Sequence, residues 1–151
     1  MFKRGGLVCA VVTVFVLLIA RAQAPNPSNP WTSQWITAPG APERDAAVLH
    51  FRKELDLAEA PKHFRIDVSA DNQFILYVNQ RRVGSGPNRS VAHWRYETYD
   101  LRRFLHAGKN VLAATVWNFG TQAALAQISD RIGFLVHGEG IAEHVADPGT
   151  S

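Results

Sequence analysis

Apolar and polar residues alternate with a period of two through most of the chain after residue 47. The stretch 48–57 reads VLHFRKELDL, in which every second residue from Leu49 to Leu57 is apolar except Lys53. Side chains of a β-strand point alternately to its two faces, so this pattern predicts a strand with one buried face. The same alternation returns over 63–70, 74–79, 110–119 and 132–138. The chain is therefore predicted to be a series of half-buried strands.

The stretch SADNQFILYVNQRRVGSGP, residues 69–87, predicts a β-hairpin. Residues 79–81 reverse the chain, and Asn79 tolerates the left-handed backbone conformation that tight hairpin turns need. Gly84 and Gly86 follow in the returning strand and relax it, and replacing either with Val is expected to destabilise by about 1 kcal/mol or more if that glycine needs a positive φ. Gln80 is expected to contribute little to stability.

One stretch has helix signals. Residues 100–107, DLRRFLHA, begin with an Asp that can cap a helix and are followed by Gly108, so one or two helical turns are expected there. Strands without alternating long helices indicate an all-β protein. The predicted fold is an antiparallel β-sandwich of the jelly-roll, galactose-binding-like kind, in which the last strands are expected to be missing.

The N-terminal 24 residues resemble a secretory signal peptide. Lys3 and Arg4 precede an apolar run of 14 residues over 7–20, and Ala22-Gln23-Ala24 fits a small-x-small cleavage site. The run is shorter than the roughly 20 residues that span a bilayer, which argues against a membrane anchor. We expect a signal peptide at 1–24, a proline-rich spacer at 25–30, a sandwich domain at 31–140 and an incomplete segment at 141–151.

Cleavage of this segment changes the charge balance. It removes Lys3, Arg4 and Arg21 and no acid, so that 16 basic residues become 13 against 13 acidic ones. A neutral exported chain gives no reason to expect nucleic acid or a membrane as partner. Cys9 is removed as well, which excludes a disulfide, a thiol nucleophile and a thiolate metal site.

Motifs for catalysis are absent from the sequence. There is no HExxH pair, no glycine-rich phosphate loop before a helix and no GxSxG elbow, and the six histidines lack metal-ligand spacing. A carboxylate pair for glycoside hydrolysis could come only from Asp71, Glu97, Asp100 and Asp130. Because Asp71 is predicted at a corner between strands and Asp100 at a helix cap, structural roles explain them. No catalytic residue, metal or cofactor is predicted.

Aromatic residues are the better candidates for binding. Exposed Trp and Tyr side chains stack on sugars, and amide groups hydrogen-bond to sugar hydroxyls. Four residues of this kind lie near predicted strand ends: Trp94, Tyr96, Trp117 and Asn118. They are the possible carbohydrate contacts, although burial in the core is the common alternative for Trp94 and Trp117.

The order and spacing of several motifs resemble the N-terminal β-sandwich region of bacterial α-L-rhamnosidases of glycoside hydrolase family 78. These motifs are WITAP, FRKELDL, the hairpin stretch, HWRYETYDLRRFLHAGKNVLAATVWNFG and AQISDRIGFLVHG, within residues 31–140. The resemblance implies hydrolysis of terminal α-L-rhamnose by an inverting mechanism. It also implies that the catalytic glutamates belong to a downstream (α/α)6 barrel, of which this sequence has no part, so none is assigned here.

The resulting hypothesis is a non-catalytic accessory or substrate-recognition domain of a secreted or periplasmic α-L-rhamnosidase, present as an N-terminal fragment. Its expected partners are rhamnose-containing glycosides and the missing catalytic domain, on which it would pack. The sequence does not decide whether the chain itself is an enzyme. Three alternatives stay open: a free-standing secreted carbohydrate-binding module, the sugar-binding domain of a β-galactosidase-like glycoside hydrolase, and a purely structural spacer without a ligand.

Overall fold

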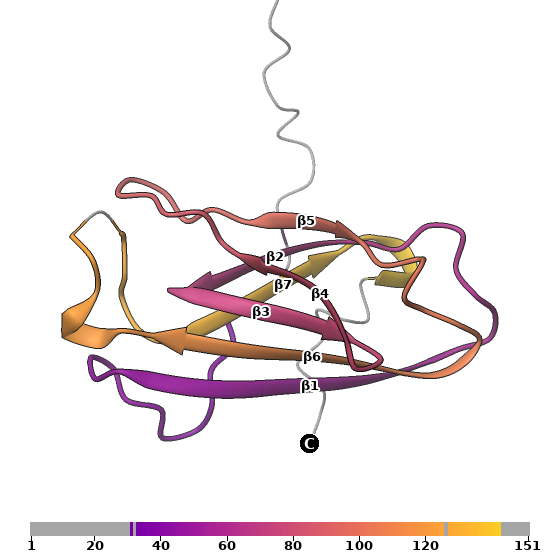
Figure 1. The fold of residues 1–151 in the computed structure, drawn as a ribbon, viewed down its shortest axis with the longest axis horizontal. Coiled ribbons are helices and arrows are strands. Elements are labelled where there is room, and N and C mark those ends of the chain that lie inside the picture. The colour runs from indigo at the N-terminus through magenta and orange to yellow at the C-terminus, as the bar shows by residue number, and fades with distance from the viewer. Residues whose placement is uncertain (1–30, 32, 126, 143–151) are drawn as a thin grey trace, which may run out of the picture. The chain divides into compact units, whose positions relative to one another are not determined.

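The computed structural model describes residues 31, 33–125 and 127–142, which form two antiparallel sheets (Figure 1). The four-stranded sheet has the order β1 (Ala47–Leu57), β6 (Gly108–Asn118), β3 (Gln73–Val78) and β4 (Arg81–Gly86). The three-stranded sheet has the order β5 (Glu97–Asp100), β2 (Arg65–Asp71) and β7 (Gly133–Gly138). Two short 3-10 turns, η1 (Gly120–Gln122) and η2 (Gly140–Ala142), are the helical elements of this part of the chain. The prediction of an all-β antiparallel sandwich is confirmed.

The core lies between the two sheets. In β6, alternate residues from Asn110 to Asn118 are buried, which is the period of two that the sequence shows. Rings from both sheets meet in the core: Phe74 of β3 lies 6.1 Å from Phe134 of β7, and Phe51 of β1 stacks on Phe134 at 5.1 Å between centroids. The other large buried side chains include Phe64, Ile66, Val68, Leu76, Val78, Leu101, Leu112, Val116 and Ile132. This shared core makes the two sheets one packed domain.

The hairpin turn has two residues, since Val78 pairs directly with Arg81. Asn79 and Gln80 both have positive φ, 49° and 67°, the combination of a type I′ turn. Neither Gly84 nor Gly86 has a positive φ. These glycines are needed instead because the side chains of Tyr99 and Glu97 occupy the space where their Cβ atoms would be.

The helix expected over 100–107 is a single turn. The cap is present, because the Asp100 carboxylate accepts a hydrogen bond from the Arg102 N–H at 3.1 Å, and Phe104 N–H bonds to the Leu101 carbonyl at 2.8 Å. The turn ends there because the Asn110 side chain binds both the N–H and the carbonyl of His106, at 3.1 and 2.7 Å. A side chain therefore takes the backbone groups that a second helical turn would use.

The signal peptide and the spacer predicted for residues 1–30 lie outside the described residues, as does most of the segment 141–151. Within the described part of the chain, no helix is long and apolar enough to span a membrane.

Candidate functional site

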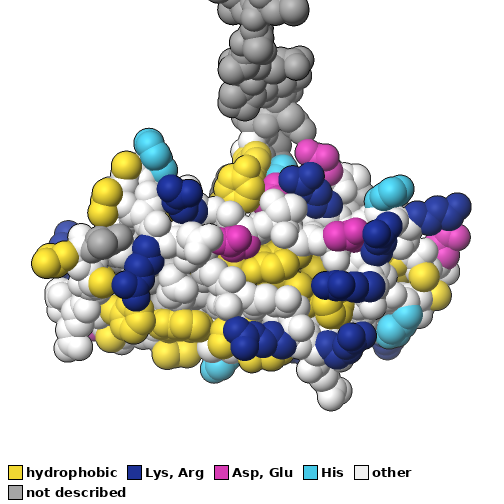
Figure 2. All heavy atoms as spheres, turned by 45° about the horizontal axis from the view of Figure 1, so that its top comes forward, with side chains coloured by type: hydrophobic (Ala, Val, Ile, Leu, Met, Phe, Trp, Pro, Cys, Tyr) yellow, Lys and Arg dark blue, Asp and Glu magenta, His cyan; other side chains and the backbone are white. Residues whose placement is uncertain are grey.

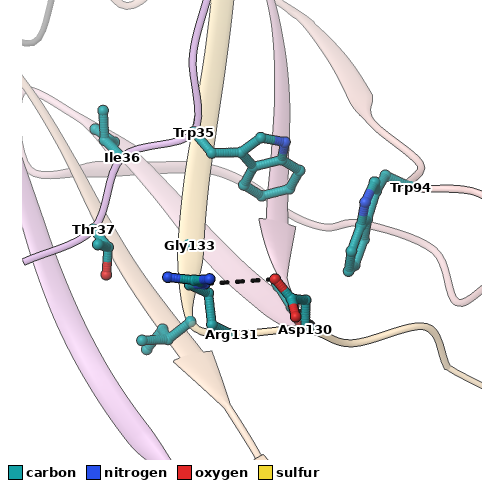
Figure 3. Close-up of a pocket in the computed structure, with 9 residues that line it drawn as sticks. Trp35, Ile36, Thr37, Trp94, Asp130, Arg131 and Gly133 are labelled. Carbon is teal, nitrogen blue, oxygen red and sulfur yellow. Dashed lines mark hydrogen bonds and ion pairs between the residues drawn. The ribbon is translucent and has the colours of Figure 1, made fainter. Parts of the chain in front are cut away.

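A hollow of about 360 Å³ lies at the end of the sandwich where β2 ends and β7 begins. Four chain segments contribute to it: the residues before β1, the β2–β3 corner, the loop before β5 and the loop before β7. Figure 3 shows the Trp35 and Trp94 rings on either side of the hollow and Asp130 and Arg131 at its lower edge. The lining residues are Trp35, Ile36, Thr37, Asp71, Trp94, Asp130, Arg131, Ile132 and Gly133.

Trp35 is positioned by a short extension of the three-stranded sheet. Its neighbour Ile36 exchanges two backbone hydrogen bonds of 2.9 Å with Phe134 of β7. This pairing fixes the backbone on the C-terminal side of Trp35, and its indole, 41% exposed, stands at the rim of the hollow. Backbone pairing of this kind holds a side chain more firmly than a free loop does.

Trp94 comes from the loop between β4 and β5, which two contacts tie to the rest of the sandwich. The Ser69 hydroxyl of β2 donates to the Arg95 carbonyl at 2.6 Å, and the Ile128 N–H donates to the Ser90 carbonyl at 2.7 Å. Trp94 is 39% exposed, and its ring centroid lies 5.5 Å from that of Trp35 with the planes tilted by 59°. The two indoles thus present neighbouring, partly exposed apolar surfaces.

Asp71 lies at the base of the hollow and is 1% exposed. Its Oδ1 accepts hydrogen bonds from the side-chain amides of Asn72 and Asn118, at 2.6 and 2.9 Å. The Ser129 hydroxyl also donates to Oδ1 at 2.9 Å, and the Asp130 N–H donates to Oδ2 at 2.6 Å. Four donors therefore converge on one carboxylate, which joins the β2–β3 corner to β6 and to the loop before β7.

Burial raises the pKa of the Asp71 carboxyl above its usual value. The hydrogen bonds from the Asp130 and Arg131 backbone and from Ser129 act in the opposite direction, because they favour the ionised form. The Asp130 charge adds a smaller upward contribution. The loss of hydration on burial is the larger effect here.

Asp130 and Arg131 give the hollow its exposed charges. Arg131 Nε lies 3.5 Å from Asp130 Oδ2, and both side chains are more than half exposed, so this ion pair adds little to stability. Asp71 and Asp130 are the one acid pair that borders the hollow among the described residues. An acid and a base for hydrolysis must both reach the substrate, and the oxygens of Asp71 already accept four hydrogen bonds.

The four predicted contact residues have different positions. Trp94 borders the hollow. Tyr96 is 52% exposed and lies 4.9 Å from Trp31, which stacks on His137 at 4.8 Å. Trp117 is a half-buried residue of β6 between Val48 and Gln73 of the neighbouring strands, on the face of the sheet turned away from the core.

Asn118, the fourth predicted contact, is 5% exposed. Its amide donates to Asp71 and to the Ser129 hydroxyl, and its carbonyl oxygen accepts from the Gly120 N–H. The structure thus brings Trp94 together with Trp35, and Asn118 with Asp71, whereas the Trp117 side chain points to the opposite face of the sheet from that of Asn118. Carbohydrate contact by these four residues stays a prediction.

Sequence reasoning did not single out Trp35 or Arg131 as site residues. A signal was available for Trp35, because WTSQW places two tryptophans before the first strand, where no core pattern requires them. The meeting of Asp71 with Asp130 had no signal, because 58 residues separate them in the sequence. Among the described residues, no three His, Cys, Asp or Glu side chains are grouped closely enough to hold a metal ion.

The fold is similar to that of a β-sandwich found in glycoside hydrolases, as comparison with solved structures indicates. No protein-family model and no curated protein sequence matches the chain. The family 78 rhamnosidase of Bacillus sp. GL1 is 26% identical, with a TM-score of 0.67, over 76% of this chain. The α-L-rhamnosidase of Dictyoglomus thermophilum is 19% identical, with a TM-score of 0.51, over 70% of this chain, which shows the shared fold.

The match takes in only a small part of each enzyme, 12% of the Bacillus chain and 14% of the Dictyoglomus chain. The described sandwich is therefore similar to a small part of these rhamnosidases. The resemblance to α-L-rhamnosidases that the sequence motifs predict is confirmed.

Proposed function

We propose that this chain is a non-catalytic accessory or substrate-recognition domain of a secreted α-L-rhamnosidase. The observation that carries the proposal is the likeness to the Bacillus rhamnosidase, at 26% identity over 76% of the chain. The enzyme as a whole would remove terminal α-L-rhamnose from glycosides. The sandwich would present its loops beside the substrate and pack against the catalytic domain.

The candidate catalytic acids already take part in hydrogen bonds and ion pairs within the fold, which supports a non-catalytic role. Asp71 is buried under four hydrogen bonds, and Glu97 accepts the Asn88 N–H at 3.1 Å. Asp100 caps the turn after β5 and pairs with Arg102 at 3.0 Å. Glycoside hydrolysis needs a proton donor and a base on opposite sides of the sugar, and these contacts give each acid a structural partner instead.

Secretion is part of the proposal. It rests on the basic start, the apolar run and the A-x-A site over residues 1–24. Cleavage after Ala24 would release a neutral chain to the periplasm or the medium.

The hollow between Trp35 and Trp94 supports direct contact with sugar. Two partly exposed indoles beside a carboxylate and a guanidinium offer stacking for a pyranose ring and hydrogen bonds for its hydroxyls. The same observation favours a second candidate, a free-standing secreted carbohydrate-binding module.

Two measurements test these proposals. Incubation of the purified exported chain with p-nitrophenyl α-L-rhamnoside is expected to release no nitrophenol. Turnover that disappears in Asp130→Asn would show a small enzyme and overturn the accessory role. The genomic reading frame after the Ser151 codon is expected to continue into an α-barrel; a stop codon there, together with rhamnose binding lost in Trp94→Ala, would favour the free-standing module.

A further inference from the structure

We propose that the other end of the sandwich binds an anionic sugar chain, carboxylated or sulfated. The inference concerns four arginines that we call the arginine surface: Arg81, Arg82, Arg102 and Arg103. The first two begin β4, and the other two lie in the turn after β5. The proposal rests on the proposed function, because an accessory domain of a glycoside hydrolase meets polysaccharides, and it adds the charge of the glycan to that function.

Two of the guanidinium groups are held on one aromatic ring. The Cζ atoms of Arg81 and Arg103 each lie 5.1 Å from the centroid of the Phe104 ring. Such cation–π contacts orient the long arginine side chains before any ligand arrives. A ligand that binds them therefore loses less side-chain entropy than it would with freely moving arginines.

The two segments that carry these arginines are also fixed to each other. Asn79, in the hairpin turn, donates from its side-chain amide to the Phe104 carbonyl at 2.9 Å and to Asn110 Oδ1 at 2.8 Å. Its Oδ1 accepts the Val111 N–H at 2.9 Å. The positions of Arg81 and Arg103 relative to each other are therefore set by the fold.

The positive charge of this surface is only partly balanced. Arg102 pairs with Asp100 at 3.0 Å, whereas within the described residues no carboxylate lies within 4.0 Å of the guanidinium nitrogens of Arg81, Arg82 or Arg103. Arg82 instead donates to the Ser85 hydroxyl at 3.1 Å. Figure 2 shows Lys and Arg side chains spread along this face, with Asp and Glu side chains beside some of those toward the right.

A hollow of about 320 Å³ lies beside these side chains. Its lining combines Arg102, Arg103, Thr98 and Asp100, the carboxylate that pairs with Arg102, with the half-buried side chains of Val83, Tyr99 and Phe104. Guanidinium groups bind carboxylates and sulfates through paired hydrogen bonds, and the apolar lining suits the carbon face of a sugar ring. A uronic acid or a sulfated sugar offers both features, and a polymer of them would reach several arginines at once.

This surface is separate from the hollow at Trp35 and Trp94. β3 runs from Gln73, next to the Asp71 corner, to Val78, next to the Asn79 turn, so the two sites lie at opposite ends of the strand (Figure 1). Substitutions at one site can therefore be tested without altering the other.

The test measures binding of polygalacturonate oligosaccharides to the purified exported chain by calorimetry at low and high salt. We expect binding that weakens as salt rises, and a loss of about tenfold in affinity for Arg103→Gln, because one charge-assisted hydrogen-bonding group is removed. Arg44→Gln removes the same charge from an exposed residue whose carbonyl accepts the Thr121 N–H of η1 at 3.1 Å, at the opposite end of the sandwich and outside both hollows, and is the matched control, with affinity expected to be unchanged. Arg103→Lys keeps the charge but loses the planar guanidinium group that donates paired hydrogen bonds. This variant is therefore expected to bind more weakly than the native chain.

Further ligands test whether the arginine surface prefers the carboxylate or the sulfate groups of a glycan. Tighter binding of dextran sulfate than of polygalacturonate would support the proposal and assign a sulfated glycan. Equal binding of neutral dextran, equal losses in Arg44→Gln and Arg103→Gln, or no binding of either anionic glycan would overturn it. Equally tight binding of polyglutamate would also overturn it, since the surface would then be a docking face for an acidic protein segment. Rhamnoside hydrolysis plays no part in this test, so its outcome is independent of the proposed function.

Discussion

Replacement of Gly84 by alanine is expected to destabilise the sandwich through a steric conflict with Tyr99. A Cβ atom at residue 84 would lie 2.7 Å from the Tyr99 hydroxyl and 2.8 Å from Cζ, with Cε1 closer still. The ring has little freedom to move, since it packs edge-on against Phe74 at 6.3 Å and its hydroxyl donates to the Ser85 carbonyl at 3.2 Å. Overpacking of this kind costs about 1–3 kcal/mol of unfolding free energy.

A double-mutant cycle isolates the cause. Tyr99→Leu removes Cε1, Cζ and the hydroxyl, the three atoms that a new Cβ would meet, while it keeps an apolar side chain against the core. In that background Gly84→Ala is expected to be close to neutral, because alanine restricts the unfolded chain more than glycine does. Gly86→Ala is a second comparison: its Cβ would meet Glu97 Cγ at 2.5 Å, and this flexible side chain can turn aside, so the cost is expected to be smaller.

The assay is urea unfolding followed by tryptophan fluorescence, with the four unfolding free energies compared at the same pH. A coupling energy of about 1–3 kcal/mol between residues 84 and 99 is expected. If Gly84→Ala costs the same with tyrosine or leucine at residue 99, the close approach to the ring is not what requires a glycine.

Four further predictions follow from the turn, the titrating groups and the N-terminus. Gln80→Gly is expected to raise the unfolding free energy by up to about 1 kcal/mol, because glycine adopts the φ of 67° without strain; a loss of stability in the same urea assay would contradict this. The raised pKa of Asp71 means that the native state holds the carboxyl proton more tightly than the unfolded chain does. The stabilisation from this group is therefore complete below the ordinary pKa of about 3.9. It is lost as the pH rises through the raised pKa of the native state. The unfolding free energy of Asp71→Asn, measured against pH, should lack this fall, and an unchanged pH profile would refute the assignment. Burial first and the Glu97 charge second raise the pKa of Tyr99, so alkaline titration at 295 nm should show a late phenolate component that Tyr99→Phe removes. N-terminal sequencing of the exported protein should begin at Pro25, and recovery of residue 2 or 3 would refute cleavage.

Much of the fold was predictable because it depends on local patterns. The alternation over 48–57 corresponds to β1 at Ala47–Leu57. Asn79, a residue type that tolerates the left-handed backbone conformation, has a φ of 49° in the turn. The requirement for glycine at residue 84, by contrast, could not be predicted from a local pattern. A strand position can require glycine because its φ is positive or because another side chain approaches it closely. At residue 84, only the packing of Tyr99 from the other sheet decides between these two reasons.

The candidate site was less predictable because it is assembled from distant segments. The Asp71 carboxylate meets Ser129 and the Asp130 N–H only after β7 has paired with β2. Trp35 reaches Trp94 through the pairing of Ile36 with Phe134, which no local pattern signals. The arginines illustrate the same limit, since their shared contact with Phe104 depends on the Asn79 bonds across the hairpin.

The strand order also has a consequence for the order of events during synthesis. Ala47 at the start of β1 pairs with Asn118, and Ile66 in β2 pairs with Gly138, so neither sheet can be completed before most of the chain has left the ribosome. Pairings between residues this distant in sequence form slowly, because a long loop must close first. The β3–β4 hairpin joins residues close in sequence and can pair early, whereas β1 must wait for β6 and β2 for β7, partners that are made 50 or more residues later.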